Sequence, residues 1–95
     1  MPSYVIVEVN IADPVRYEEY KKLSGPSLVP FGGRFIVRGG PVEVLEGNHN
    51  PGRIVVLEFP SREQAKAWWG SDSYRPAKAI RQAVATTEMI LVDGI

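Results

Sequence analysis

The fold of this chain is decided by the stretch Arg53–Trp69, RIVVLEFPSREQAKAWW. Its first seven residues are rich in β-branched side chains and are typical of a strand. Ser61, followed three residues later by Gln64, is the capping-box pattern that begins a helix. Trp68 and Trp69 then lie on the apolar stripe of that helix. The stretch is therefore predicted to be a strand that leads directly into a helix.

Further strands are predicted on both sides of this stretch. They cover Tyr4–Asn10 (YVIVEVN), Arg34–Arg38 (RFIVR) and Thr87–Asp93 (TEMILVD). Val42–Glu46 (VEVLE) is predicted to continue the second of these or to form a short extra strand. The following segment, Gly47–Gly52, has the composition of a turn throughout.

A helix is predicted from about Pro14 towards Leu28, because Asp13 is a good N-cap and Pro14 suits the first helical position. Gly25-Pro26 is expected to break or bend it. Apolar spacing over Ala77–Val84 marks a further short helix. The order is β-α-β-β-α-β, which predicts one α+β domain over residues 1–95 with a ferredoxin-like four-stranded antiparallel sheet, spatial order 4-1-3-2.

Composition excludes several kinds of site and partner. Eleven basic and eleven acidic residues cancel, and no basic cluster of the kind that binds nucleic acid is present. The chain has no cysteine, so disulfides and cysteine metal sites are excluded. No apolar run is long enough for a membrane span, and the first residues do not resemble a secretory signal, so we expect a cytoplasmic protein. A domain this small gains stability from association.

Successive strand residues point to opposite faces of a sheet. One set is wholly apolar and should lie under the helices: Val5, Val7, Val9, Phe35, Val37, Val55, Leu57, Phe59, Met89 and Leu91. The other set, here called the mixed face, combines aliphatic and charged residues: Tyr4, Ile6, Glu8, Asn10, Arg34, Ile36, Arg38, Ile54, Val56, Glu58, Glu88, Ile90 and Val92. Two helices cover only one face, and an uncovered apolar patch usually marks an interface. We therefore expect a homodimer formed through the mixed face.

The strand order also places the charges of the mixed face. Glu58 and Arg34 are expected to be neighbours at one end of the sheet and to form a pair. Glu8, with Glu88 opposite or beside it, Asn10 and Arg38 gather at the other end. The polar ends either form a rim of the dimer interface or line a ligand cavity, and the pattern alone leaves both readings open.

Three segments of the chain resemble a known family. They are Tyr4–Tyr20 (YVIVEVNIADPVRYEEY), Phe31–Gly47 (FGGRFIVRGGPVEVLEG) and Arg53–Tyr74 (RIVVLEFPSREQAKAWWGSDSY). Together they resemble the bacterial domain-of-unknown-function family 1330. The resemblance implies a dimeric α+β barrel, in which two ferredoxin-like sheets pack face to face. Relatives in that superfamily include cofactor-free monooxygenases and muconolactone-isomerase-like enzymes, but the resemblance implies no established reaction.

Candidates for catalysis are few. His49 is the only histidine, so any histidine-based proton transfer must use it, although its setting between two asparagines indicates a solvated turn. Glu8 is a candidate base if crowding by Glu88 raises its pKa. A single histidine also argues against a histidine metal site within one chain, and no metal or other cofactor is expected.

A ligand site, if present, is expected near Asn10 and Arg38, beside the bend at Gly39-Gly40. Trp69 and Tyr74 would supply an aromatic wall, and a guanidinium matches a ligand carboxylate. These residues favour a dimeric domain that binds a small organic acid or aromatic molecule, and whether it is a cofactor-independent enzyme stays open. The alternative is a non-catalytic interaction module, which a filled space between sheet and helices would favour.

Overall fold

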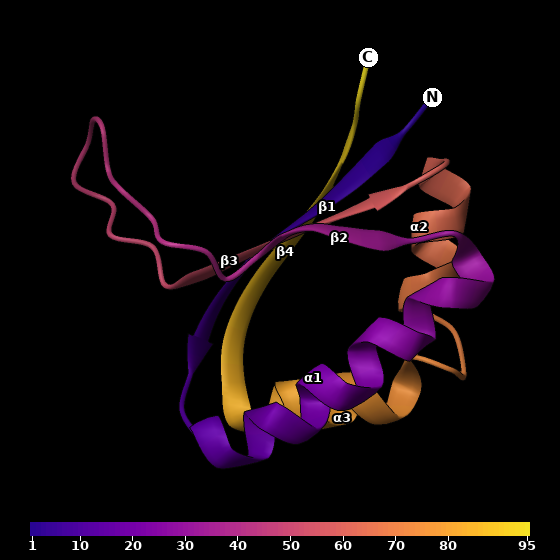
Figure 1. Cartoon of the computed structure of the whole chain (residues 1–95), viewed down its shortest axis with the longest axis horizontal. Coiled ribbons are helices and arrows are strands. Elements are labelled where there is room, and N and C mark those ends of the chain that lie inside the picture. The colour runs from indigo at the N-terminus through magenta and orange to yellow at the C-terminus, as the bar shows by residue number, and fades with distance from the viewer.

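The computed structural model describes residues 1–95 and contains one four-stranded sheet with its helices on one side (Figure 1). Its elements are β1 (Ser3–Ile11), α1 (Pro14–Leu28), the 3₁₀ helix η1 (Val29–Phe31), β2 (Arg34–Arg38), β3 (Arg53–Phe59), α2 (Arg62–Trp69), α3 (Arg75–Val84) and β4 (Ala85–Asp93). The strand order is β2-β3-β1-β4 and every neighbouring pair is antiparallel. This confirms the predicted 4-1-3-2 ferredoxin-like sheet.

Helix α1 begins where the sequence predicts. Asp13 caps it, since its carboxylate accepts a hydrogen bond from the backbone N–H of Arg16 at 3.2 Å. Of the two predicted outcomes at Gly25-Pro26, the break is wrong, because Pro26 lies in the last turn of an unbroken helix, where its missing N–H costs only one backbone bond. The chain continues into η1 and turns at Gly32, whose φ of 69° favours glycine.

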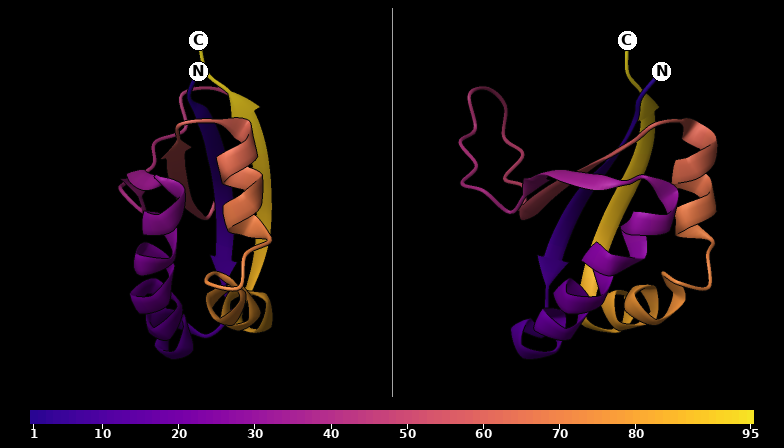
Figure 2. Two further views of the ribbon diagram at one scale, coloured as in Figure 1. Left: turned by 90° about the vertical axis from the view of Figure 1, so that its right-hand side faces the viewer. Right: turned by 45° about the vertical axis from the view of Figure 1, so that its right-hand side comes forward.

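The predicted strand at Val42–Glu46 is also wrong. Residues 39–52 have no regular secondary structure and form a long arm between β2 and β3. Figure 2 shows this arm extending away from the sheet on the side opposite the helices. Gly39 starts the arm with a φ of 73°, and Pro41 has no N–H to donate to a neighbouring strand.

The core lies between the helices and one face of β1 and β3. Val5, Val7 and Val9 alternate inward from β1, and Val55, Leu57 and Phe59 do so from β3. Trp68 packs on Phe59 at 5.4 Å between ring centroids and on Tyr74 at 4.1 Å. The aromatic cluster therefore ties α2 and the start of α3 to the sheet.

A β-bulge in β2 changes the predicted facing of its last residues. Phe35 pairs with Leu57, but Val37 pairs with Val56 and Arg38 with Val55, so one extra residue is inserted between Phe35 and Val37. A one-residue slip moves the following side chains to the other face. The predictions that Val37 lies under the helices and Arg38 on the mixed face are therefore wrong. Arg38 shares the helix-covered face with Val55.

No helix covers the rest of the mixed face in the single chain, as expected, although His49 of the arm contacts Glu8 at one end of it. Its exposed aliphatic side chains include Ile36, Ile90 and Val92, which are 42%, 60% and 43% exposed. Ile6, Ile54 and Val56 are half-buried. Glu8 lies opposite Glu88, and Arg34 lies opposite Glu58, as the strand order predicts.

Candidate functional site

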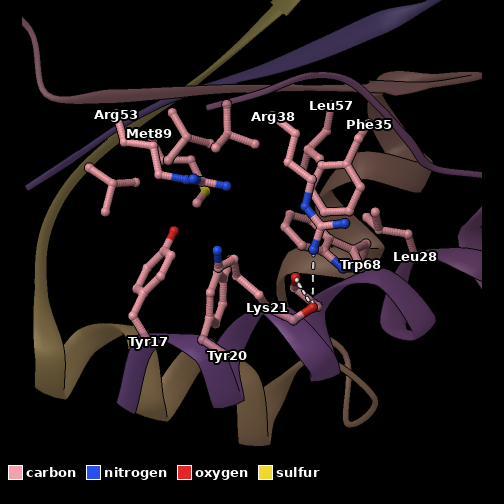
Figure 3. Close-up of a pocket in the computed structure, with 14 residues that line it drawn as sticks. Tyr17, Tyr20, Lys21, Leu28, Phe35, Arg38, Arg53, Leu57, Trp68 and Met89 are labelled. Carbon is pink, nitrogen blue, oxygen red and sulfur yellow. Dashed lines mark hydrogen bonds between the residues drawn. The ribbon is translucent and has the colours of Figure 1, made fainter. Parts of the chain in front are cut away.

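A small cavity lies between α1 and the helix-covered face of the sheet (Figure 3). Its walls are mainly apolar and come from β1, β2, β3, α1, α2 and β4. The polar side chains that line it are Tyr17, Tyr20, Lys21, Ser24, Arg38 and Arg53. Its volume is about 20 Å³, which is room for about one water molecule.

Two arginines reach this cavity from the strands that flank the arm. Arg53, the first residue of β3, lies opposite Val9, and its guanidinium carbon is 5.8 Å from the centroid of the Tyr17 ring. Its Nε atom is buried and has no hydrogen-bond partner. Gly39 packs directly against this guanidinium, where any Cβ would clash.

Arg38 lies at the mouth of the cavity, where the bulge in β2 places it. Its guanidinium carbon is 4.0 Å from the centroid of the Phe35 ring, and its Nη2 donates a hydrogen bond to the carbonyl oxygen of Lys21 at 3.1 Å. Lys21 itself pairs with Glu18 at 2.9 Å. No aspartate or glutamate lines the cavity, and neither arginine forms an ion pair. The cavity therefore carries an excess of positive charge.

Tyrosines form the opposite wall, on α1. Tyr20 Oη lies 3.0 Å from Tyr74 Oη, and Arg81 Nε donates to Tyr74 Oη at 3.2 Å. Burial raises the pKa of Tyr20 strongly, and its hydrogen bond and proximity to Tyr74 add to the effect. Burial also raises the pKa of Tyr17, although the nearby Arg53 opposes the shift. Both phenols are therefore neutral at pH 7 and are suited to donate hydrogen bonds rather than to accept a proton.

Trp68 closes the inner end of the cavity and is held in a fixed orientation. Its indole N–H donates to Ser27 Oγ at 3.0 Å, and Ser27 Oγ in turn donates to the carbonyl oxygen of Ser24 at 2.6 Å. Ser27 and Ser24 are both buried on the inner side of α1. The hydrogen bonds of Ser27 and Ser24 therefore hold the Trp68 ring in place as an aromatic wall of the cavity.

The four predicted ligand-binding residues do not meet in one place. Arg38 lines the cavity, and Tyr74 lies fully buried behind Tyr20 and Trp68. Trp69 is 48% exposed and lies outside this cavity, with the Lys78 ammonium 3.8 Å from its ring centroid. Asn10 is exposed near the end of β1 and does not line the cavity.

The two predicted catalytic candidates do lie together, but away from the cavity. His49 is an exposed residue of the arm, and its Nε2 lies 2.9 Å from Glu8 Oε1 on the mixed face. No three His, Cys, Asp or Glu side chains gather closely enough to hold a metal ion. The helices are also too short or too polar for any of them to cross a membrane.

Four cavity residues were not predicted from the sequence: Arg53, Tyr17, Tyr20 and Lys21. Strand alternation places Arg53 on the same face as Val55, so its inward direction could have been predicted. Tyr17, Lys21 and Leu28 share the helical spacing that marks the inner side of α1. The sequence could not show that Arg53 has no carboxylate partner, because this depends on the folded arrangement.

A family model, "Domain of unknown function (DUF1330)", matches residues 2–95. The chain belongs to the DUF1330 family. Among curated proteins, none matches this DUF1330 chain. The family description names no reaction, so membership shows which proteins this chain is related to but not what chemistry it performs.

Solved structures resemble the DUF1330 chain over nearly its whole length. RPA0582 of Rhodopseudomonas palustris, a protein of unknown function, is 21% identical with a TM-score of 0.80, covering 99% of this chain and 82% of that one. A dimeric ferredoxin-like protein of unknown function from Jannaschia is 14% identical with a TM-score of 0.71, covering 99% and 100%. SnoaB, a cofactor-independent oxygenase from Streptomyces nogalater, is 11% identical with a TM-score of 0.67, covering 99% and 93%. At these identities the likeness shows the fold alone.

Proposed function

We propose that this chain forms a homodimer in which each subunit binds a small organic acid in the cavity between α1 and the sheet. One observation carries the proposal. Arg53, whose buried Nε has no hydrogen-bond partner, lines a cavity that Arg38 also lines and that no carboxylate neutralises. Buried donors are almost always hydrogen-bonded, so an unpaired guanidinium nitrogen in a cavity wall is a natural contact for an anion.

The cavity has to open to admit more than a water molecule, and Arg38 is its gate. Arg38 is exposed and is held across the mouth by one hydrogen bond to Lys21 and by its stacking on Phe35. The hydrogen bond contributes about 1 kcal/mol and the exposed cation–π contact about 0.5–1 kcal/mol. Swinging Arg38 aside therefore costs only about 2 kcal/mol, which a new ion pair with the ligand offsets.

The surrounding groups define the kind of ligand. Arg38 and Arg53 match the two oxygens of a carboxylate, and the neutral Tyr17 hydroxyl provides a further donor. Val7, Leu57 and Trp68 form an apolar wall for the rest of the molecule. A slender aromatic or conjugated acid suits this lining, because its carboxylate would meet the arginines and its carbon skeleton would meet the apolar wall.

An enzymatic role is one form of this proposal. SnoaB, whose fold resembles this one, is described as a cofactor-independent oxygenase. Guanidinium and phenol donors around an acid would also stabilise negative charge that develops on it during a reaction. The direct test is oxygen uptake with any acid that binds, measured with and without the Arg53→Gln substitution.

A second candidate function has its own support. The cavity is nearly filled at about 20 Å³, and this favours a non-catalytic module whose polar residues only organise the dimer. The two functions differ in one measurable respect, because a module of this kind would not be stabilised by small acids.

Self-association is proposed through the mixed face. Two solved neighbours are described as dimeric ferredoxin-like proteins. In this chain the mixed face exposes Ile36, Ile90 and Val92, and burying such side chains contributes about 1.5–3 kcal/mol each. The face lies on the side of the sheet opposite the cavity, so a dimer of this kind leaves the cavity free for its ligand.

A thermal-shift screen of small organic acids tests the ligand proposal. Arg38→Gln removes the gate cation, and Arg75→Gln is the matched control, since Arg75 is an exposed arginine of α3 whose partner is Asp72. We expect at least one acid to stabilise the wild type and Arg75→Gln but not Arg38→Gln. Equal stabilisation of all three proteins would move the site elsewhere, and no stabilisation by any acid would favour the interaction module.

A further inference from the structure

A second positively charged group lies buried on the other side of Trp68. Arg81 of α3 is only 5% exposed, yet it forms no ion pair with any carboxylate. Its Nε donates to Tyr74 Oη at 3.2 Å, and its two terminal nitrogens form no hydrogen bond within the chain. A buried charge without a counter-ion is unfavourable, so a partner from outside the chain is the physical expectation.

Arg81 lines an open groove between α2, α3 and the edge strand β4. The groove has a volume of about 380 Å³, within the range of about 300–1,000 Å³ that small-molecule sites occupy. Gln82 and Thr87 provide its other polar groups. The hydroxyl oxygen of Thr87 is buried and has no hydrogen-bond partner. A buried hydroxyl without a hydrogen-bond partner and a cation without a counter-ion thus belong to the same groove.

We propose that this groove binds the carboxylate of a small aromatic acid, with Arg81 as the counter-ion and Thr87 Oγ1 as a hydrogen-bond donor. Trp69 also lines the groove and is 48% exposed, so its indole can cover one face of the ligand ring. The Lys78 ammonium, 3.8 Å from the Trp69 ring centroid, adds positive potential at this rim. No aspartate or glutamate lines the groove.

This groove is distinct from the cavity beside α1. The two share only Trp68 and Met89 in their linings, and neither Arg38 nor Arg53 reaches the groove. The groove lies mainly on the helix side of the sheet, so a dimer formed through the mixed face would leave Arg81 and Thr87 without a partner. A free acid is therefore the occupant that the geometry favours over a segment of a second copy.

The experiment follows the Trp69 indole N–H by ¹H–¹⁵N NMR while benzoate is added at low ionic strength. Benzoate is expected to shift the Trp69 signal with saturation, whereas benzamide, which has the same ring and no charge, is not. Arg81→Gln should weaken benzoate binding at least about tenfold, which corresponds to one lost charge-assisted contact. Because Arg81→Gln also removes a partner of Tyr74, Thr87→Val provides the second test.

Thr87→Val separates a binding role from a structural one. It replaces a buried hydroxyl that has no partner, so the free protein should be as thermally stable as the wild type or more so. Binding of benzoate should nevertheless weaken about three- to tenfold. A Trp69 signal that does not move at millimolar benzoate would overturn the proposal, and so would unchanged affinity in Thr87→Val. Loss of the Trp69 shift in Arg38→Gln would also overturn it, since benzoate would then occupy the other cavity.

Discussion

Replacing Arg34 with methionine measures whether a second copy covers the mixed face. Arg34 Nε and Nη2 both donate to Glu58 Oε1, at 3.0 and 2.8 Å. In the single chain the two side chains are 67% and 25% exposed. A pair with this exposure contributes only about 0.2–1 kcal/mol. If the mixed face stays in water, Arg34→Met should therefore lower the free energy of unfolding by less than about 1 kcal/mol.

Burial in a dimer changes that magnitude. Arg34 and Glu58 lie on the mixed face, where Ile36, Ile90 and Val92 are the exposed aliphatic groups. When a partner subunit removes water from this face, Arg34→Met leaves the Glu58 carboxylate buried and unpaired, at a cost of about 3–5 kcal/mol. We expect the larger value, because the dimer is the state that the mixed face favours.

The assay is denaturant unfolding followed by tryptophan fluorescence, at several protein concentrations because a dimer's stability depends on concentration. Sedimentation of the same samples reports the oligomeric state. Arg75→Met is the matched control, since Arg75 pairs with Asp72 at 2.7 Å and both side chains are well exposed in the helix layer. It should cost less than about 1 kcal/mol. If Arg34→Met costs no more than Arg75→Met while the wild type sediments as a dimer, the dimer does not bury the Arg34–Glu58 pair, and the mixed face is not its interface.

Further substitutions test the mixed face, the packing around Phe59 and the buried Tyr20. Val56→Asp places a charge in the middle of the mixed face and should give monomeric or insoluble protein by size-exclusion chromatography. Gly33→Ala should destabilise the chain by about 1–3 kcal/mol in denaturant unfolding, since its Cβ would lie 2.6 Å from Cε1 of the fully buried Phe59, whereas Gly40→Ala, with open space around it, should have little effect. Tyr20 has its pKa raised by burial from the ordinary 10.0, so its contribution to stability is complete below pH 10 and is lost as the pH rises above that value. Tyr20→Phe should therefore reduce the alkaline loss of stability in a pH series of melting curves, and an unchanged alkaline slope would show that another group controls it.

The fold was predictable because its signals are local and repeated. Strand alternation in Tyr4–Asn10 and Arg53–Phe59 selects the buried face, and Asp13 and Ser61 fix where two helices begin. Within the arm, Val42–Glu46 was misread because VEVLE has strand-like composition but finds no neighbouring strand with which to pair, whereas Gly47–Gly52 was predicted to be irregular. Strand propensity reflects packing on a sheet, so composition alone cannot replace a partner.

The site was less predictable, because it depends on one inserted residue and on missing partners. The bulge before Val37 moves Arg38 from the mixed face into the cavity mouth, and no residue type in RFIVR marks that slip. The strand pattern does give the inward direction of Arg53. Whether Arg53 Nε finds a hydrogen-bond partner depends on which groups come near it in the folded chain. The same holds for the terminal nitrogens of Arg81.

In the proposed function, Arg38 and Arg53 hold an anion between α1 and the sheet. The most direct test is ¹H–¹⁵N NMR of the arginine Nε–H groups during titration with sorbate, a slender conjugated acid that suits the narrow cavity. Arg38 and Arg53 are expected to shift together with one dissociation constant, while Arg75, which is exposed and paired with Asp72, stays unchanged. If Arg38 and Arg53 do not move, or if all arginines move alike, the cavity is not an acid-binding site.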